Sequence, residues 1–260
     1  MKIPAIVGIV NGTPDSFSDG GAYDPVSHAL RLADEGAAML DIGGESTRPG
    51  ALAVDESEEK ARVIPVIRTI LRLRPGTQIS VDTRRASTAA AALELGAVMV
   101  NDVSAGRDPD MFTLCGKAGA TMVLMHMRGS PTTMRDLAIY DDVCAEVWSE
   151  LAERAQAATK AGIHRIVLDP GLGFAKSPAQ NFAILRDLPN RRQHTVMVGA
   201  SRKSFIGETT GQAVAADRVE GSIAVALHCM ESGVGWVRVH DVASTRRAFA
   251  VRAAIAGTMP

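Results

Sequence analysis

Short apolar runs recur along the whole chain, and a polar residue closes each of them. A strand of a parallel sheet is buried on both faces, so it reads as a continuous apolar stretch that stops where the strand stops. The runs and their closing residues are AIVGIV before Asn11, AAML before Asp41, QISV before Asp82, AVMV before Asn101, TMVLM before His126, RIVL before Asp169, VMVGA before Ser201 and WVRV before His240. The pattern predicts eight buried parallel strands.

Helical patterns fill the segments between these runs. Apolar residues recur there at spacings of three and four, and several segments end in glycine, as at Gly36, Gly96, Gly162 and Gly233. The expected helices span residues 25–36, 55–73, 85–95, 110–118, 142–161, 178–188, 218–232 and 243–255. Strand and helix therefore alternate from end to end.

This alternation predicts an α/β protein, a single (β/α)8 TIM barrel that spans residues 1–260 as one domain. A doubly wound open sheet is the alternative, because it has the same alternation of strand and helix. The first strand is not followed by the G-x-G-x-x-G turn that many such sheets use to bind dinucleotides. The number of units and the missing turn favour the closed barrel.

Charge and composition exclude several kinds of partner. A net charge of -1 gives no overall field that would attract nucleic acid, and no apolar stretch approaches the roughly 20 residues needed to cross a bilayer. The three cysteines are an odd number with wide spacing, which fits neither a disulfide framework nor a zinc site. We therefore expect a cytoplasmic protein that binds neither nucleic acid nor membranes.

Three of the expected connections are long and rich in glycine, proline or polar residues, namely 11–24, 43–55 and 127–142. Loops of this kind are usually binding elements. We expect all three at the carboxyl ends of the strands, where the active sites of (β/α)8 barrels lie.

Three strand ends offer groups that suit a flat heterocycle. Asp82, Asn101 and Asp169 follow their runs without a spacer, and the strand ends of a barrel meet at one rim. A carboxylate can accept two parallel donors, such as an amino group beside a ring N–H. Asp and Asn are also ordinary turn formers, but the three together favour a pterin or guanine site.

A second set of rim residues is basic. Its members are Arg48, Arg202, Lys203, Arg238 and His240. The loops after the seventh and eighth strands are the usual phosphate site of this fold, so the set predicts a phosphorylated or diphosphate substrate. Arg238 lies inside the apolar run WVRV, where an unpaired charge would be costly to bury. We therefore expect it to have an anionic partner.

The chain also contains NGTPDSFSDGG, DIGGESTRPGA, SVDT, NDVSAG, LMHMRG, LDPGLGFAK, GASRKSFIG and RVHDV, in this order between residues 6 and 242. Together these blocks closely resemble the dihydropteroate synthase family. The resemblance implies a transferase that condenses 6-hydroxymethyl-7,8-dihydropterin diphosphate with 4-aminobenzoate, giving diphosphate and 7,8-dihydropteroate in folate biosynthesis. It also implies a (β/α)8 barrel, dependence on Mg²⁺, a homodimer and a sulfonamide target.

The resemblance further assigns roles to individual positions. The positions that match the family's pterin contacts are Asp82, Asn101, Asp169 and Lys203. Those that match diphosphate contacts are Thr47, Arg238 and His240, with Arg48 nearby. The aminobenzoate contacts correspond to Phe17, Pro49, Phe174 and Ser204, and the magnesium-associated asparagine corresponds to Asn11. Asp82, Lys203 and Arg238 are the expected catalytic residues.

One position departs from the family pattern, and two other functions stay open. Gly12 stands where the family usually has a bulkier aliphatic residue, which loosens the backbone at the start of the first loop. A methyltransferase barrel that passes a folate methyl group to a corrinoid has similar pterin contacts, but it is not expected to have SRKS or NGTPDSFSDGG. A pterin-binding paralogue without activity is the other alternative.

Overall fold

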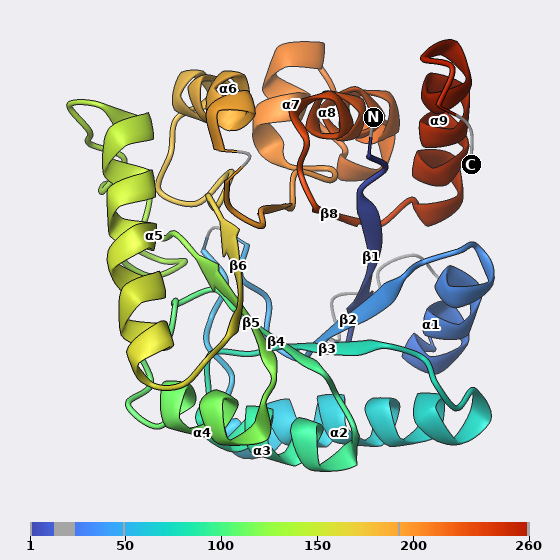
Figure 1. Cartoon of the computed structure of the whole chain (residues 1–260), viewed down its shortest axis with the longest axis vertical. Helices are drawn as coiled ribbons and strands as arrows, with labels where there is room; N and C mark the ends of the chain where they lie inside the picture. The colour runs from blue at the N-terminus through green and yellow to red at the C-terminus, as the bar shows by residue number, and fades with distance from the viewer. Residues whose placement is uncertain (1, 13–23, 49, 192, 259–260) are drawn as a thin grey trace.

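Eight parallel strands form one closed barrel in the computed structural model, which describes residues 2–12, 24–48, 50–191 and 193–258 (Figure 1). The strands are β1 (Ala5–Asn11), β2 (Met39–Gly43), β3 (Ile79–Asp82), β4 (Met99–Asp102), β5 (Thr121–Met125), β6 (Arg165–Asp169), β7 (Met197–Val198) and β8 (Trp236–Val239). Their order in the sheet is β6-β5-β4-β3-β2-β1-β8-β7. A parallel bridge between Leu168 and Val196 joins the two ends of this sheet. The barrel is confirmed, and the open sheet is wrong.

The helices surround the barrel (Figure 1). They are α1 (Pro25–Asp34), α2 (Glu56–Leu73), α3 (Ala86–Leu95), α4 (Met111–Ala118), α5 (Val143–Lys160), α6 (Pro178–Asp187), α7 (Ser204–Thr210), α8 (Val219–Ser232) and α9 (Val242–Ile255). Eight of them match predicted segments. The pattern missed α7 as a periodic segment, because its seven residues are too few to show a helical period.

Local sequence signals explain where the helices begin and end. Asp24 and Asp142 accept hydrogen bonds from backbone N–H groups at the starts of α1 and α5, and Ser177 with Gln180 forms a capping box at α6. Gly96 and Gly233 end α3 and α8 in the left-handed conformation that glycine adopts without strain. These signals are short-range, which is why the sequence alone located most of the helices.

The inside of the barrel is apolar toward the amino-terminal ends of the strands. Its buried residues there are Val7, Met39, Met99, Val123, Val167 and Met197. A second and larger apolar layer lies between the barrel and its helices, and includes Leu32 of α1, Ile42 of β2 and Ile67 of α2. Alternate residues of a strand face opposite sides, so Ile42 faces the helices while its neighbours in β2 face the interior.

The register of the strands places polar residues above the apolar interior layer. Asp41 pairs with Ser80, Gly43 pairs with Asp82, and Asp82 pairs in turn with Asn101. Asp41 was expected to close its run, but it lies in the middle of β2 and is buried. The strand continues past it because Arg238 and Asn101 pair with the carboxylate inside the barrel.

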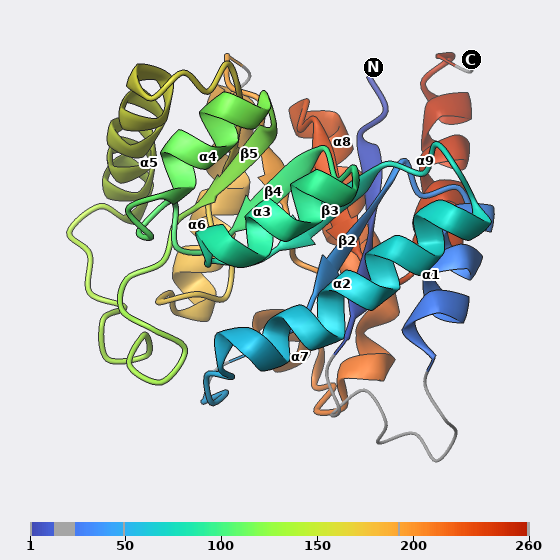
Figure 2. The same ribbon diagram turned by 90° about the horizontal axis from the view of Figure 1, so that it is seen from below.

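The carboxyl ends of the strands all lie at one end of the barrel. Figure 2 shows the loops after β2 and β5 at this end, with the two chain termini at the opposite end. The rim predicted from the sequence is therefore a single surface. No helix in the described part of the chain is long and apolar enough to span a membrane.

Phe249 provides a test of how α9 packs against the core. This side chain is 1% exposed, whereas Val251 on the same helix is 61% exposed. We expect Phe249→Ala to lower the free energy of unfolding by about 3–5 kcal/mol, because it leaves a cavity in the core. Val251→Ala is the matched control and should change it by less than about 0.5 kcal/mol. Urea unfolding measures both, and equal losses would contradict the burial of Phe249 in the core.

Candidate active site

Arg238 lies at the centre of a polar layer in the mouth of the barrel. Its Nε donates to Asp41 Oδ2 at 2.5 Å, and its Nη2 donates to Asp82 Oδ2 at 2.7 Å. Asn101 Nδ2 donates to the same Asp41 oxygen at 2.9 Å. The expected anionic partner of Arg238 is thus a pair of carboxylates, and four strands contribute to this one cluster.

Burial dominates the electrostatics of Asp82. Removal from water raises the pKa of this carboxyl to about 7, and the nearby carboxylates of Asp41 and Glu59 act in the same direction. The positive charge of Arg238 opposes the rise. Asp82 is therefore a carboxyl group whose charge depends on what else enters the mouth of the barrel.

Asp169, Lys203 and Phe174 form a second group at the same rim. Asp169 ends β6, and its Oδ1 accepts a hydrogen bond from the backbone of Gly171 at 2.8 Å. Lys203 precedes α7; its Nζ donates to the Leu172 carbonyl and lies 4.5 Å from the centre of the Phe174 ring. Burial lowers the pKa of Lys203 to about 8, and the charge of Asp169 opposes this fall.

Gly171 and Gly173 allow the loop after β6 to pass close to its neighbours. Both have positive φ, at 64° and 80°. A Cβ on Gly171 would lie 2.0 Å from the carbonyl oxygen of His126, and one on Gly173 would lie 3.1 Å from Lys203 Cδ. Only glycine fits these positions without displacement, and the loop therefore brings Phe174 onto Lys203.

His240 lies in a strongly cationic part of the rim. Its Nδ1 is 3.0 Å from Ser201 Oγ, and its backbone N–H donates to the same hydroxyl at 3.2 Å. Burial lowers the pKa of His240 to about 3, helped by the charges of Arg202, Arg238 and Arg48. The ring is therefore neutral, and the surrounding arginines favour an anion at this place.

Arg202, next to Ser201, is paired with a carboxylate of its own. Its Nε and Nη2 donate to the two carboxylate oxygens of Asp241, at 3.0 and 2.6 Å. Its φ of 59° is unusual for a residue with a side chain. The paired carboxylate neutralises much of its charge, as Asp41 and Asp82 do for Arg238, which leaves the exposed Arg48 as the stronger candidate for binding an anion.

The other predicted residues lie at the rim with fewer contacts. Asn11 ends β1 opposite Gly43, Thr47 is half-buried in the loop after β2, and Arg48 and Ser204 are exposed. Phe17 and Pro49, together with most of the loop after β1, lie outside the described residues. No group of three His, Cys, Asp or Glu side chains in the described ranges is arranged to hold a metal ion.

Sequence reasoning missed two buried charged residues next to the site. Asp41 was treated as a strand end, although the alternation of β2 could have placed it on the inner face with Met39. Lys176 was noted only as part of a motif. Its buried Nζ lies 3.0 Å from His126 Nδ1 and donates to the carbonyls of Phe174 and Gly171 at 3.0 and 3.1 Å. It therefore holds the loop after β6.

His126 connects this lysine to α5. Its Nε2 lies 3.0 Å from Glu150 Oε2, and its side chain is only 2% exposed. Burial, together with the adjacent charge of Lys176, lowers the pKa of His126 to about 4, against the opposing charge of Glu150. The ring is therefore neutral in the folded protein at neutral pH.

Comparisons with known proteins agree on one family. A family model described as "Pterin binding enzyme" matches residues 7–240. The dihydropteroate synthase of Neisseria meningitidis serogroup B is 47% identical over 262 residues, which cover 95% of this chain and 91% of that protein. A Xanthomonas albilineans dihydropteroate synthase with 4-aminobenzoic acid has a TM-score of 0.92 and 46% identity, covering 100% of this chain and 95% of its own. A second structure from that organism, in complex with 7,8-dihydropteroate, has a TM-score of 0.89, 43% identity and the same coverage.

The neutral His126 predicts a loss of stability in acid. Its pKa of about 4 in the folded protein is below the ordinary 6.5, so the unfolded chain binds a proton more readily as the pH falls between these values. Between these pH values we expect the free energy of unfolding of His126→Gln to fall by less than that of the unchanged protein, the difference being on the order of 3 kcal/mol. Urea unfolding at several pH values measures the slope. The exposed His164→Gln serves as the control, and an unchanged slope in His126→Gln would refute the assignment.

Proposed function

This chain belongs to the dihydropteroate synthase family, and we propose that the carboxyl-end rim of its barrel carries out the reaction of that family. The reaction condenses 6-hydroxymethyl-7,8-dihydropterin diphosphate with 4-aminobenzoate, and it gives 7,8-dihydropteroate and diphosphate in folate biosynthesis. The enzyme is a transferase. The observation that supports our assignment of the site is that Asp82, Asn101, Asp169, Lys203 and Arg238 gather at one end of the barrel.

The pterin ring is assigned to the deepest part of the mouth. Asp169 accepts hydrogen bonds from the amino group and ring N–H, since a carboxylate can receive two parallel donors. Asn101 provides both a donor and an acceptor for the ring edge, and the Lys203 ammonium donates to the pterin carbonyl. The charge of each of these two groups, Asp169 and Lys203, affects the pKa of the other, which supports our assignment of both to the same ligand.

The diphosphate is assigned to the cationic side of the rim. Arg238, Arg48 and Thr47 donate to its oxygens, and the neutral ring of His240 adds a further donor. Asn11 offers an amide oxygen, which is the kind of ligand that Mg²⁺ accepts, and Mg²⁺ usually takes its remaining ligands from substrate phosphates and water. When bound, Mg²⁺ would neutralise charge on the departing diphosphate.

The aminobenzoate is assigned to the outer part of the rim. The Phe174 ring, which already packs on Lys203, forms one wall, and Ser204 at the start of α7 lies where the carboxylate of the substrate can be received. Phe17 and Pro49, which lie outside the described residues, complete this pocket in our proposal. The amine then faces the reacting carbon.

Departure of diphosphate is proposed to precede attack by the amine. The C–O bond at the pterin methylene carbon breaks, the electron pair leaves with diphosphate, and the electron-rich pterin spreads the positive charge. Asp82 opposes this charge, and Arg238 holds Asp82 in position. The neutral aryl amine then forms the C–N bond and releases its proton. The loop that carries Arg48 would exclude water from the reacting carbon, together with Asp15 and Phe17, which lie outside the described residues.

We further propose a homodimer that works in the cytoplasm. The homodimer follows from the family to which the chain belongs. Cys115, Cys144 and Cys229 are all free, which suits a reducing compartment. Sedimentation of the purified protein tests the oligomeric state.

Release of diphosphate tests the function directly. Purified protein with Mg²⁺ and both substrates should form one 7,8-dihydropteroate for each diphosphate, and removal of Mg²⁺ by EDTA should suppress both products. Phosphate analysis and chromatography measure the two products. Tight binding of pterin diphosphate without release would instead favour a pterin-binding module without activity.

Substitutions test the assigned residues. Lys203→Ala removes a donor to the pterin, and Asp82→Asn removes the charge that opposes the developing cation. We expect each to lower kcat by at least about a hundredfold with little change in the circular dichroism spectrum. Lys117→Ala, at the end of α4 and exposed, is the control and should leave kcat unchanged. Near-normal turnover in either site variant would reject that residue's role.

A further inference from the structure

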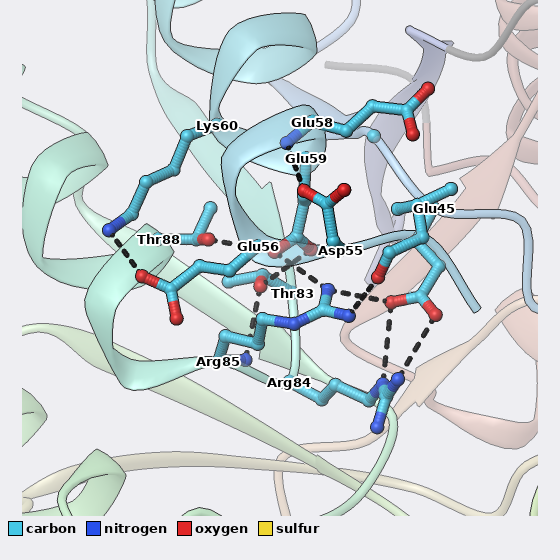
Figure 3. Close-up of polar contacts among 12 residues, drawn as sticks. Glu45, Asp55, Glu56, Glu58, Glu59, Lys60, Thr83, Arg84, Arg85 and Thr88 are labelled. Atoms are coloured by element: carbon cyan, nitrogen blue, oxygen red, sulfur yellow. Dashed lines mark hydrogen bonds and ion pairs between the residues drawn. The ribbon is translucent and has the colours of Figure 1, made fainter.

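A cluster of charged and hydroxyl side chains lies behind the rim, outside the proposed substrate site. Figure 3 shows it around Arg85, with Glu45, Glu59, Thr83, Arg84 and Thr88. Glu59 is completely buried; its two oxygens accept hydrogen bonds from the hydroxyls of Thr83 and Thr88 at 2.8 and 2.7 Å. Because Glu59 is buried and both of its oxygens are hydrogen-bonded, the cluster is not a set of solvated surface charges.

The guanidinium of Arg85 reaches three separate parts of the chain. Its Nη1 lies 2.9 Å from Glu45 Oε2 and 3.0 Å from Glu59 Oε2. Its Nη2 donates to the backbone carbonyl of Val54. Because the guanidinium is a planar fork with several fixed donors, one side chain can make these contacts together.

Two of these contacts are at opposite ends of the loop after β2. This loop runs from the end of β2 at Gly43 to the start of α2 at Glu56. Glu45 is near its beginning and Val54 is near its end, so Arg85 holds the two ends together. Thr47 and Arg48 lie between the two held points.

Arg85 is itself fixed relative to the catalytic rim. It follows Asp82 by three residues, and its backbone N–H donates to the Thr83 hydroxyl at 3.1 Å. The third contact, with Glu59, ties it to α2. Arg85 therefore fixes the position of the loop relative to the end of β3 and to α2.

Stability alone does not account for this arrangement. Two carboxylates, of which Glu59 is completely buried, face one half-buried guanidinium, and a buried ion pair commonly costs as much in desolvation as it gains in attraction. Such a network does provide a fixed geometry, because the planar guanidinium of an arginine donates hydrogen bonds only in a narrow range of directions.

We propose that Arg85 is a positioning residue that clasps both ends of the loop after β2, and thereby sets where Thr47 and Arg48 meet the diphosphate of the substrate. The proposal rests on the proposed function in one respect, namely that these two residues contact diphosphate. The clasp itself is a property of the free protein. Arg85 touches no substrate and acts only through the loop.

Arg85→Lys tests the clasp, and the chain offers a matched control in its neighbour. Arg84 also pairs with Glu45, at 3.1 Å, but its side chain is 43% exposed and it reaches neither Glu59 nor Val54 in the described contacts. A lysine keeps the charge but cannot supply the fork. We expect Arg85→Lys to speed amide hydrogen exchange in residues 45–54 by at least about tenfold, and Arg84→Lys to leave it unchanged.

Ligand affinity supplies a second measurement that a general loss of stability would not reproduce. Arg85→Lys should weaken binding of the pterin diphosphate by at least about tenfold, while binding of the same pterin without diphosphate stays as in the unchanged protein. Calorimetry measures both affinities. Equal weakening of the two ligands, or unchanged affinity for both, would overturn the proposal.

Glu45→Gln covers the case in which Arg85→Lys fails to fold. It leaves the Arg85–Glu59 pair in place and weakens the contacts of Glu45 with Arg85 and Arg84 at the beginning of the loop, of which Arg84→Lys tests the second alone. We expect the same two changes in the same direction, and unchanged exchange in a folded Glu45→Gln would count against the clasp. If the unchanged protein does not bind pterin diphosphate, the proposed function fails, while hydrogen exchange still decides whether the clasp exists.

Discussion

The ion cluster of Arg238 with Asp41 and Asp82 is the interaction on which the mouth of the barrel depends. A charge inside a barrel must be paired, because the interior offers no water to solvate it. Arg238 meets this condition through two carboxylates from β2 and β3, and Asp41 also receives the amide of Asn101 from β4. One guanidinium therefore fixes the relative positions of side chains from four strands.

Burial requires these charges to be paired, and it also shifts the pKa values of the groups that would meet a ligand. It raises the pKa of Asp82 and lowers the pKa of Lys203, so both groups are easier to neutralise than they are in water. A substrate that brings hydrogen-bond donors or developing positive charge to Asp82, and a hydrogen-bond acceptor to Lys203, stabilises the ionised forms of both groups. Shifted pKa values of this kind are typical of catalytic sites, where they follow from burial beside a specific charge.

The proposed site divides its work between strands and loops. The residues assigned to the pterin lie at or next to strand ends, whose positions are set by the register of the sheet. Several residues assigned to the diphosphate and the aminobenzoate lie on loops, which need their own supports. Lys176 holds the loop after β6 through backbone carbonyls, and Arg85 holds the loop after β2 at both ends. Lys176 is buried and Arg85 is half-buried, and both donate to carbonyl or carboxylate oxygens.

The sequence by itself determined the eight strands, eight of the nine described helices and the rim positions of Asp82, Asn101 and Asp169. Apolar runs, helical periodicity and glycine stops are local, and each is complete within a few residues. Only the tertiary structure decided which charges meet. Arg238 and Asp41 are 197 positions apart, and Arg85 meets Glu45 across 40 positions, so no local pattern records either pair. Strand register and barrel closure bring them together, because a buried charge must find its partner wherever the fold places it.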